Sequence, residues 1–333
     1  MKHRVNRIVA AAILGVGLVT GSYAPAYAAP AWSLPAQGVQ LDRAAKQAYV
    51  TDRMYTAFHK AQKTAPAAFT APDGWSYTQL TEKDVKIEKL VNPQGSPART
   101  VLQLHGGGYI APLTNAYRHI AVQQAVLANA RETYMVDYKL APEYKYPAAL
   151  DDALTAYTFI VKEGIRPQDI IVFGDSAGGN LALAMSQKLR DEHVPQPGLL
   201  ILDSPWATAE TQSPSRQNHV DQDMVLGKIN EAMFREINAP SFVPKGMKLS
   251  DPRISPLHGD LTGLPPMLIQ AGGYELFLDE NIELAKKAAA AGVKVTLTVY
   301  PAMSHDFALC IPELQDSVDS FAEIRDFVNA NMK

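Results

Sequence analysis

A serine between two glycines is the residue of this chain best placed to do chemistry. The segment Gly174-Asp175-Ser176-Ala177-Gly178 follows an apolar run, 170–173, and precedes a segment with helical spacing. It fits the G-x-S-x-G turn between a strand and a helix, where bulky flanking side chains would collide with the backbone. Such a turn lifts the hydroxyl above the sheet, and the helix N-terminus beneath it favours developing negative charge. The motif therefore predicts Ser176 as a nucleophile; the alternative is a glycine-rich turn with a serine cap.

A triple-glycine segment could supply the second part of this chemistry. His105-Gly106-Gly107-Gly108 comes directly after the strand-like run 100–104. Three glycines expose backbone N–H groups and let the chain approach a ligand closely. These groups, together with the N–H of Ala177, could bind the oxyanion of a tetrahedral intermediate. Beside the serine motif, the segment favours an oxyanion hole over a flexible turn.

A histidine and an acidic residue late in the chain could complete a catalytic triad. His305 follows the last expected strand, which is the place of the base if the triad runs serine, acid, histidine. Its role would be to take the proton of Ser176 and return it to the leaving group. The acid should follow the apolar run 266–271, and both Glu275 and Asp279 do so. We prefer Glu275, because Asp279 would begin the next helix, where a carboxylate has a structural role.

Short apolar strands alternate with helices along most of the chain, and they must position these residues. The alternation predicts an α/β fold with a mostly parallel central sheet and helices on both faces. Strands are expected at 85–90, 100–104, 132–138, 170–173, 199–202, 266–271 and 293–300, and helices at 41–62, 116–130, 147–163, 177–192, 278–291 and 314–332.

One long segment, 207–265, breaks this alternation. It is polar, contains several prolines and has little strand signal. An insertion of this kind over an α/β core is often a lid or a cap. The alternative is a mobile surface loop.

The first 28 residues have the pattern of a secretory signal peptide. A basic start is followed by a short apolar run, 8–19, and by the small-x-small sequence Ala26-Tyr27-Ala28. The apolar run is shorter than the roughly 20 residues that span a bilayer. We therefore expect cleavage close to Ala29 and a secreted mature chain without a membrane span, rather than an uncleaved anchor.

Composition narrows the classes of partner. The 333 residues carry a net charge of −3, with 47% hydrophobic and 20% charged residues, which is ordinary for a globular enzyme and gives no sign of a nucleic-acid partner. No zinc-protease, C-x-x-C or P-loop motif is present, so we expect neither a metal nor an organic cofactor. Cys310 is the single cysteine, and its apolar neighbours favour a buried structural thiol.

Taken together, the motifs resemble the hormone-sensitive lipase family of bacterial esterases, within the α/β-hydrolase fold. The matching blocks are HGGGY, DYKLAPEYKYPAALDDA, GDSAGGN, GGYELFLDEN and YPAMSHDF, which occur in the family's order over about 85–320. Many members have Asp-Pro-Leu where this chain has Glu275-Leu276-Phe277. The resemblance implies Ser176 as the nucleophile, His305 as the base, oxyanion donors from Gly107, Gly108 and Ala177, and His105 as a residue that orients the loop.

The same resemblance implies a helical cap, built from N-terminal helices at about 38–75 and from the insertion. We thus expect a signal peptide at 1–28, a lead-in with cap helices at 29–84, and a catalytic domain at 85–333 whose cap insertion spans about 207–265. Members act mostly on short-chain carboxylic esters, so the expected function is a secreted serine carboxylesterase with a small-molecule ester substrate. A lipase, an amidase or a polysaccharide deacetylase could use the same triad, and a non-catalytic ligand-binding protein could use the same fold. Family analogy also suggests a homodimer through the last strand.

Overall fold

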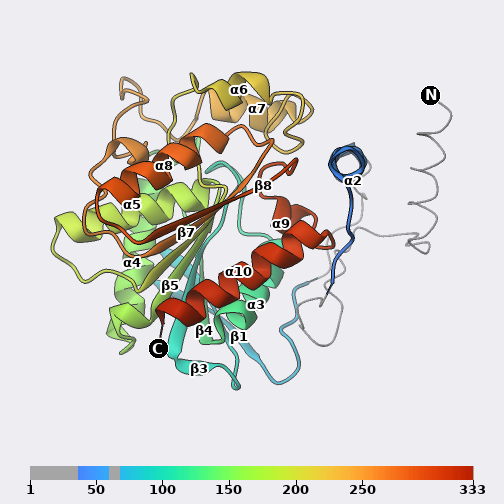
Figure 1. The fold of residues 1–333 in the computed structure, drawn as a ribbon. Helices are drawn as coiled ribbons and strands as arrows, with labels where there is room; N and C mark the ends of the chain where they lie inside the picture. Colours follow the sequence, from blue (N-terminus) through green and yellow to red (C-terminus); the bar gives the residue numbers. More distant parts are fainter. Residues whose placement is uncertain (1–36, 60–67, 333) are drawn as a thin grey trace, which may run out of the picture.

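The computed structural model describes residues 37–59 and 68–332, and an eight-stranded sheet forms the centre of this part (Figure 1). The predicted signal peptide lies outside the described residues. Strands β3 to β8 run parallel, whereas β2 pairs antiparallel with both β1 and β4. The spatial order is β1 (Ser76–Glu82), β2 (Val85–Val91), β4 (Ala130–Asp137), β3 (Ser96–Leu104), β5 (Ile170–Asp175), β6 (Leu199–Asp203), β7 (Met267–Gly272) and β8 (Val295–Tyr300).

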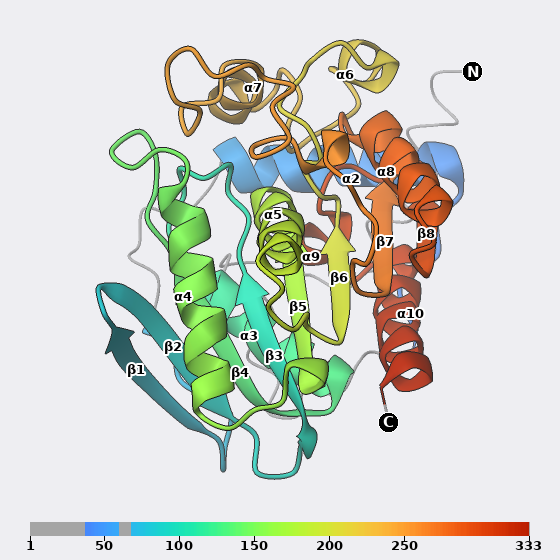
Figure 2. The same ribbon diagram turned by 90° about the vertical axis from the view of Figure 1, so that its left-hand side faces the viewer.

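Helices cover both faces of the sheet, as the alternation predicts (Figure 2). One face carries α3 (Asn115–Ala128) and α10 (Gln315–Asn331), and the other carries α4 (Ala148–Lys162), α5 (Ala177–Asp191) and α8 (Leu278–Ala290). Two short pieces, η1 (Pro167–Asp169) and α9 (Phe307–Cys310), precede β5 and α10.

The central strand β5 is apolar over 170–173 because both of its faces are covered. All six of its residues are buried. Successive side chains point to opposite faces, so Ile170 and Val172 join the core cluster that contains Leu181, while Ile171 and Phe173 join the cluster that contains Phe321. A strand buried on both faces reads as a continuous apolar run rather than as an alternation.

The sheet begins at Ser76 and not at the predicted boundary of 85. Strand β1 (SYTQLTE) pairs with β2 through a tight turn at Lys83, whose φ is 56°. Polar side chains dominate this outer strand and most of them are exposed or half-buried, which is common where one strand edge faces water. The run of apolar residues that marks the other strands in the sequence is therefore missing from β1.

The long insertion and the N-terminal helix both lie at the end of the sheet where the parallel strands finish (Figure 2). The insertion contains α6 (Pro214–Asn218), α7 (Glu231–Asn238) and η2 (Pro256–His258). Helix α2 (Arg43–His59) is the one described helix of the predicted lead-in. Its Lys46 forms an ion pair of 2.6 Å with Asp316 and donates a hydrogen bond to the carbonyl of Pro301.

The carboxyl end of the described chain lies at the opposite end of the sheet. Arg99, near the start of β3, donates hydrogen bonds to the carbonyls of Met332 and Ala128, both at 3.1 Å. Figure 2 shows the end of α10 and the helices α6 and α7 at opposite ends of the strands. Within residues 37–59 and 68–332, no helix is long and apolar enough to cross a bilayer.

Candidate active site

Ser176 sits at the sharp junction of β5 and α5, with a φ of 52° and a ψ of −118°. Few residues other than glycine adopt such a backbone, and strain of this kind persists only where the surroundings hold it. Here β6 does so: the N–H of Ser176 donates to the carbonyl of Asp203 at 3.0 Å, and the carbonyl of Ser176 accepts from the N–H of Trp206 at 2.9 Å. A side chain on Gly178 would overlap the carbonyl oxygen of Leu104. The glycine of the motif thus lets α5 approach β3 closely.

The triple-glycine segment follows β3 and lies beside the serine turn. Gly107 and Gly108 have φ values of 102° and 64°, which a side chain would strain. The N–H of Gly106 donates to Oδ1 of Asp175 at 3.1 Å, and this bond fixes the loop against β5. Within the described part of the chain, the N–H groups of Gly107, Gly108 and Ala177 donate no hydrogen bond. The three predicted oxyanion donors are therefore available for a ligand.

His105 has the surroundings of a structural imidazole. Its ring is fully buried and stacks on Tyr138, with centroids 4.2 Å apart and an interplanar angle of 11°. Its Nδ1 lies 2.8 Å from the carbonyl oxygen of Gly106. Burial lowers the pKa of His105 to about 4, so the ring is neutral at neutral pH. This placement suits a residue that orients the glycine loop.

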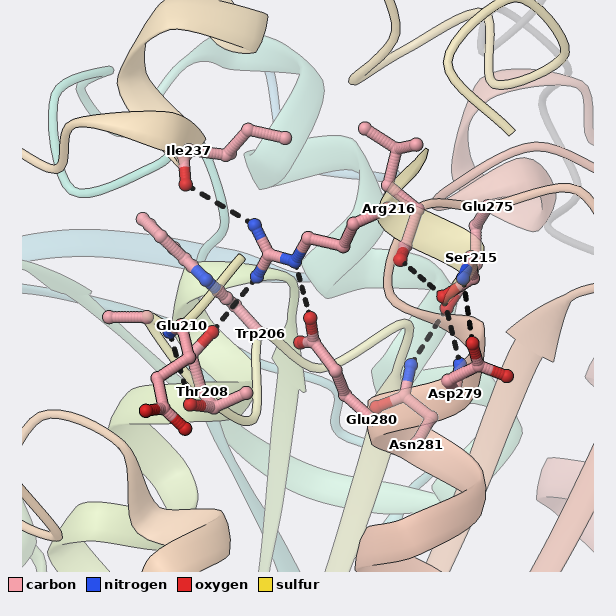
Figure 3. A network of polar contacts seen from close by, with 12 residues as sticks. Trp206, Thr208, Glu210, Ser215, Arg216, Ile237, Glu275, Asp279, Glu280 and Asn281 are labelled. Atoms are coloured by element: carbon pink, nitrogen blue, oxygen red, sulfur yellow. Dashed lines mark hydrogen bonds and ion pairs between the residues drawn. The ribbon is translucent and has the colours of Figure 1, made fainter. Parts of the chain in front are cut away.

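Glu275 lies in the buried loop after β7, and its carboxylate has three donors. Oε2 accepts from Ser204 Oγ at 2.6 Å and from the N–H of Gly272 at 2.8 Å, while Oε1 accepts from Asn281 Nδ2 at 2.7 Å. Burial raises the pKa of Glu275 to about 8, against the opposing effect of the nearby His305 charge. Asp279 instead accepts from the N–H of Ser215 at 2.7 Å, at the start of α8 (Figure 3). The structure thus gives the two acids the different surroundings that the sequence argument expects.

His305 follows β8 and is almost fully buried, with 1% of its surface exposed. Its ring packs edge-on against Phe277, with centroids 5.0 Å apart. Nε2 lies 3.1 Å from Oδ2 of Asp306, but neither ring nitrogen makes a hydrogen bond within the described residues. The hydrogen bonds from His305 to Ser176 and Glu275 are therefore not formed here; such bonds often tighten only around a substrate.

The loops that carry the acid and the histidine are nonetheless joined directly. The N–H of Gly273 donates to the carbonyl of Tyr300 at 2.8 Å, and the N–H of Tyr274 donates to the carbonyl of Met303 at 2.9 Å. The charge of His305 lowers the pKa of Glu275, although burial outweighs this effect. The structure therefore brings the predicted nucleophile, acid, base and oxyanion donors together at one end of the sheet.

Ser204 is a site residue that the sequence argument missed. It follows β6, is fully buried and has a φ of 46°. Its Oγ donates to Glu275 and accepts from the N–H of Asp306 at 3.1 Å. One hydroxyl thus connects the acid with the residue next to His305. In the sequence, Ser204 is marked only by its position directly after β6; the neighbouring strands β5 and β7 are also followed by site residues.

A cluster of buried carboxyl groups surrounds the site. Burial raises the pKa of Asp175 to about 6, although the hydrogen bond from Tyr117, at 2.7 Å, opposes this. Burial likewise raises the pKa values of Asp203 and Asp306 well above their usual range, and the neighbouring carboxylates add to the effect. Among the described residues, no three His, Cys, Asp or Glu side chains are grouped to hold a metal ion.

Comparison with known proteins also indicates the α/β-hydrolase fold and ester hydrolysis. A family model described as the alpha/beta hydrolase fold matches residues 101–309. An esterase of Acinetobacter venetianus is 33% identical over 240 residues, which cover 72% of this chain and 78% of that protein. An acetyl-hydrolase of Streptomyces hygroscopicus is 35% identical over 215 residues, covering 65% and 70%. A crystal structure of an esterase from the bacterial hormone-sensitive lipase family matches with a TM-score of 0.76 at 28% identity, covering 89% of this chain and 100% of that one.

Proposed function

Because the chain belongs to the hormone-sensitive lipase family of the alpha/beta hydrolase fold, and is thus a serine hydrolase of carboxylic esters, we propose that it acts through an acyl-enzyme on Ser176 and prefers short acyl chains. One observation carries the proposal. Ser176 sits on a positive-φ turn beside three N–H groups that have no partner among the described residues. This is the arrangement that acyl transfer needs at the carbonyl carbon.

The proposed reaction has two stages. Ser176 Oγ attacks the ester carbonyl carbon while His305 takes its proton, and the N–H groups of Gly107, Gly108 and Ala177 bind the oxyanion. Collapse of this intermediate breaks the bond to the alcohol, which leaves with the proton from His305. Water, deprotonated by His305, then attacks the carbonyl carbon of the acyl-enzyme; the bond to Ser176 Oγ breaks, the carboxylic acid leaves, and His305 returns the proton to Ser176. Glu275 stabilises the imidazolium in both stages.

The closed surroundings of the nucleophile support a small substrate. Ser176 and His305 are 3% and 1% exposed, and the cap insertion lies over the same end of the sheet. The relative from Streptomyces hygroscopicus is named an acetyl-hydrolase, which points in the same direction. A lipase would need an opening to Ser176 that is deep enough to hold a long acyl chain.

The decisive experiment replaces Ser176 with Ala and assays p-nitrophenyl esters from acetate to palmitate. We expect a loss of at least about 10³-fold in kcat on acetate and butyrate, since the residual rate comes only from binding and the oxyanion hole. The exposed Ser250→Ala serves as the control and should retain full activity. Undiminished turnover by Ser176→Ala would rule out the nucleophile, and a wild-type optimum at palmitate would favour a lipase.

We also propose export by the signal sequence at 1–28 and, from the family resemblance, pairing of two chains through β8. Strand β8 lies at one edge of the sheet, where a second strand could add. N-terminal sequencing of the protein from the culture medium tests the export and the cleavage near Ala29. Sedimentation of the mature chain tests the pairing; a monomer at all concentrations would exclude it.

A further inference from the structure

The cap helix α7 contacts the oxyanion loop most closely through Met233. A Cβ built on Gly108 would lie 2.9 Å from Cε of Met233, and the next group from this helix, Cγ of Glu236, would be 3.5 Å away. The methyl group of Met233 therefore packs on the backbone of Gly108. This methyl group therefore lies next to the loop whose Gly108 N–H is a proposed donor to the ester carbonyl oxygen.

A buried arginine of the neighbouring helix α6, Arg216, is hydrogen-bonded to α7 (Figure 3). Nη1 of Arg216 donates to the carbonyl of Ile237, at the end of α7, and Nη2 donates to the carbonyl of Thr208 at 2.9 Å. Nε is paired with the carboxylate of Glu280, on the core helix α8. Both charged side chains are only 2% exposed. A buried pair of this kind depends on geometry, because either charge alone would be costly.

The same arginine also reaches the loop of the proposed triad acid. Its guanidinium lies 4.5 Å from the ring centroid of Phe277, the ring that packs against His305. The preceding residue, Ser215, donates from Oγ to the carbonyl of Leu276 at 2.8 Å. Helix α6 is thus fixed to the loop that carries Glu275, and α7 is fixed to α6.

From these contacts we propose that Met233 limits the size of the ester that reaches Ser176, and that the buried Arg216–Glu280 pair holds Met233 in place. Met233 would be a specificity-determining residue, and Arg216 a positioning residue that touches no substrate. The inference rests on the proposed oxyanion role of Gly108. It goes beyond the presence of a cap, since it assigns the size limit to one side chain and its placement to one ion pair.

The first test is Met233→Ala, assayed on p-nitrophenyl esters of graded acyl length and on acetates of graded alcohols. In one of the two series we expect kcat/KM for the larger ester relative to the smallest to rise at least about tenfold, since each added methylene that fits a pocket changes this ratio by about 10–200-fold. Glu231→Gln, an exposed position on the same helix, is the matched control and should leave both ratios unchanged. Ratios within about twofold of wild type in both series would overturn the assignment of Met233.

The second test is Arg216→Lys, which keeps the charge but loses the fork that contacts Ile237 and Thr208. We expect the same change in substrate ratio as for Met233→Ala, but smaller, and less than additive in the double variant. A merely structural role would lower the Tm and leave the ratio untouched, because the ratio does not depend on the folded fraction. Should Arg216→Lys fail to fold, Ser215→Ala loosens α6 without leaving a buried charge.

The outcomes separate this inference from the proposed function. If Ser176→Ala remains active, the proposed acyl-enzyme fails whatever the substrate ratios show. If activity depends on Ser176 but Arg216→Lys, or Ser215→Ala in its place, keeps the wild-type ratio, the positioning role of Arg216 fails alone.

Discussion

Among single residues, Ser204 lies outside every sequence motif, yet its hydroxyl joins the loop of the proposed acid to the loop of the proposed base. Its partners Glu275 and Asp306 lie 71 and 102 positions further along the chain. Its oxygen donates to one and accepts from the other, so it fixes the acid relative to the histidine loop. A hydrogen bond to a charged group contributes about 1.5–3 kcal/mol. We therefore expect its main effect on kcat, where the orientation of the triad matters, and little effect on binding.

Ser204→Ala tests this role. We expect kcat to fall roughly 10-fold or more with little change in KM, from the loss of the hydrogen bond to Glu275. The rising limb of the pH profile should also move to higher pH, because that hydrogen bond lowers the pKa of Glu275 and its loss raises it. Ser204→Gly, which suits the positive φ, should show the same losses. Wild-type kcat in the glycine variant would mean that backbone conformation, and not the hydroxyl, explains the effect.

The sequence predicted those site residues that belong to a local motif. Ser176 and the glycines stand in short segments whose backbone needs are readable, and His305 and Glu275 follow strands. The preference for Glu275 over Asp279 rested on a loop against a helix start, and the structure places the two residues in those surroundings. Ser204 and Arg216 could not be found, because their roles arise from contacts between segments far apart in the chain.

Among secondary-structure elements, apolar strands and long helices were predictable and polar or short ones were not. The expected strand at 170–173 is observed as Ile170–Asp175, and the expected helix at 177–192 as Ala177–Asp191. Strand β1 escaped because its residues are mostly polar at a sheet edge. Helix α7 spans only eight residues within a polar insertion, too few for its periodicity to stand out.

Helix α2 offers a test of how the N-terminal part is attached. Lys46→Ala removes the ion pair between Lys46 and Asp316, in which the side chain of Lys46 is 11% exposed and that of Asp316 is 16% exposed. We expect the free energy of unfolding to fall by about 2 kcal/mol, between the values typical of exposed and buried pairs. Thermal or urea unfolding measures this, with the exposed Thr51→Ala as the control on the same helix. A loss no larger than that of the control would show that the Lys46–Asp316 ion pair contributes little to the attachment of α2.

For the whole molecule, the main feature is a concentration of buried carboxyl groups at one end of the sheet. The site residues come from the ends of β3, β5, β6, β7 and β8, because the carboxyl ends of parallel strands meet at one edge (Figure 2). Glu275, Asp175, Asp203 and Asp306 all lie there with raised pKa values. At these four groups the folded protein therefore binds protons more tightly than the unfolded chain between about pH 4 and 8, whereas the lowered pKa of His105 acts in the opposite direction below about pH 6.5.

This difference gives a pH dependence of stability. A raised folded-state pKa contributes stability below the unfolded value, and this contribution is lost as the pH rises through the folded value. We expect the Tm to fall between pH 5.5 and 8.5, each such group contributing up to about 1.4 kcal/mol per pH unit. Glu275→Gln, which cannot ionise, should make the fall shallower while reducing kcat by about 10³–10⁴-fold. A wild-type Tm that rises over this range would contradict the expectation.

The bond between Arg99 and Met332 has a practical consequence for attaching the molecule to a solid support. It holds the carboxyl end of α10 at the end of the sheet opposite the cap. A tag added beyond this end, fixed to a resin or displayed on a cell, would leave the insertion and the serine turn facing outward into the medium. The tether needs no long spacer, because the sheet itself separates the point of attachment from the proposed active site.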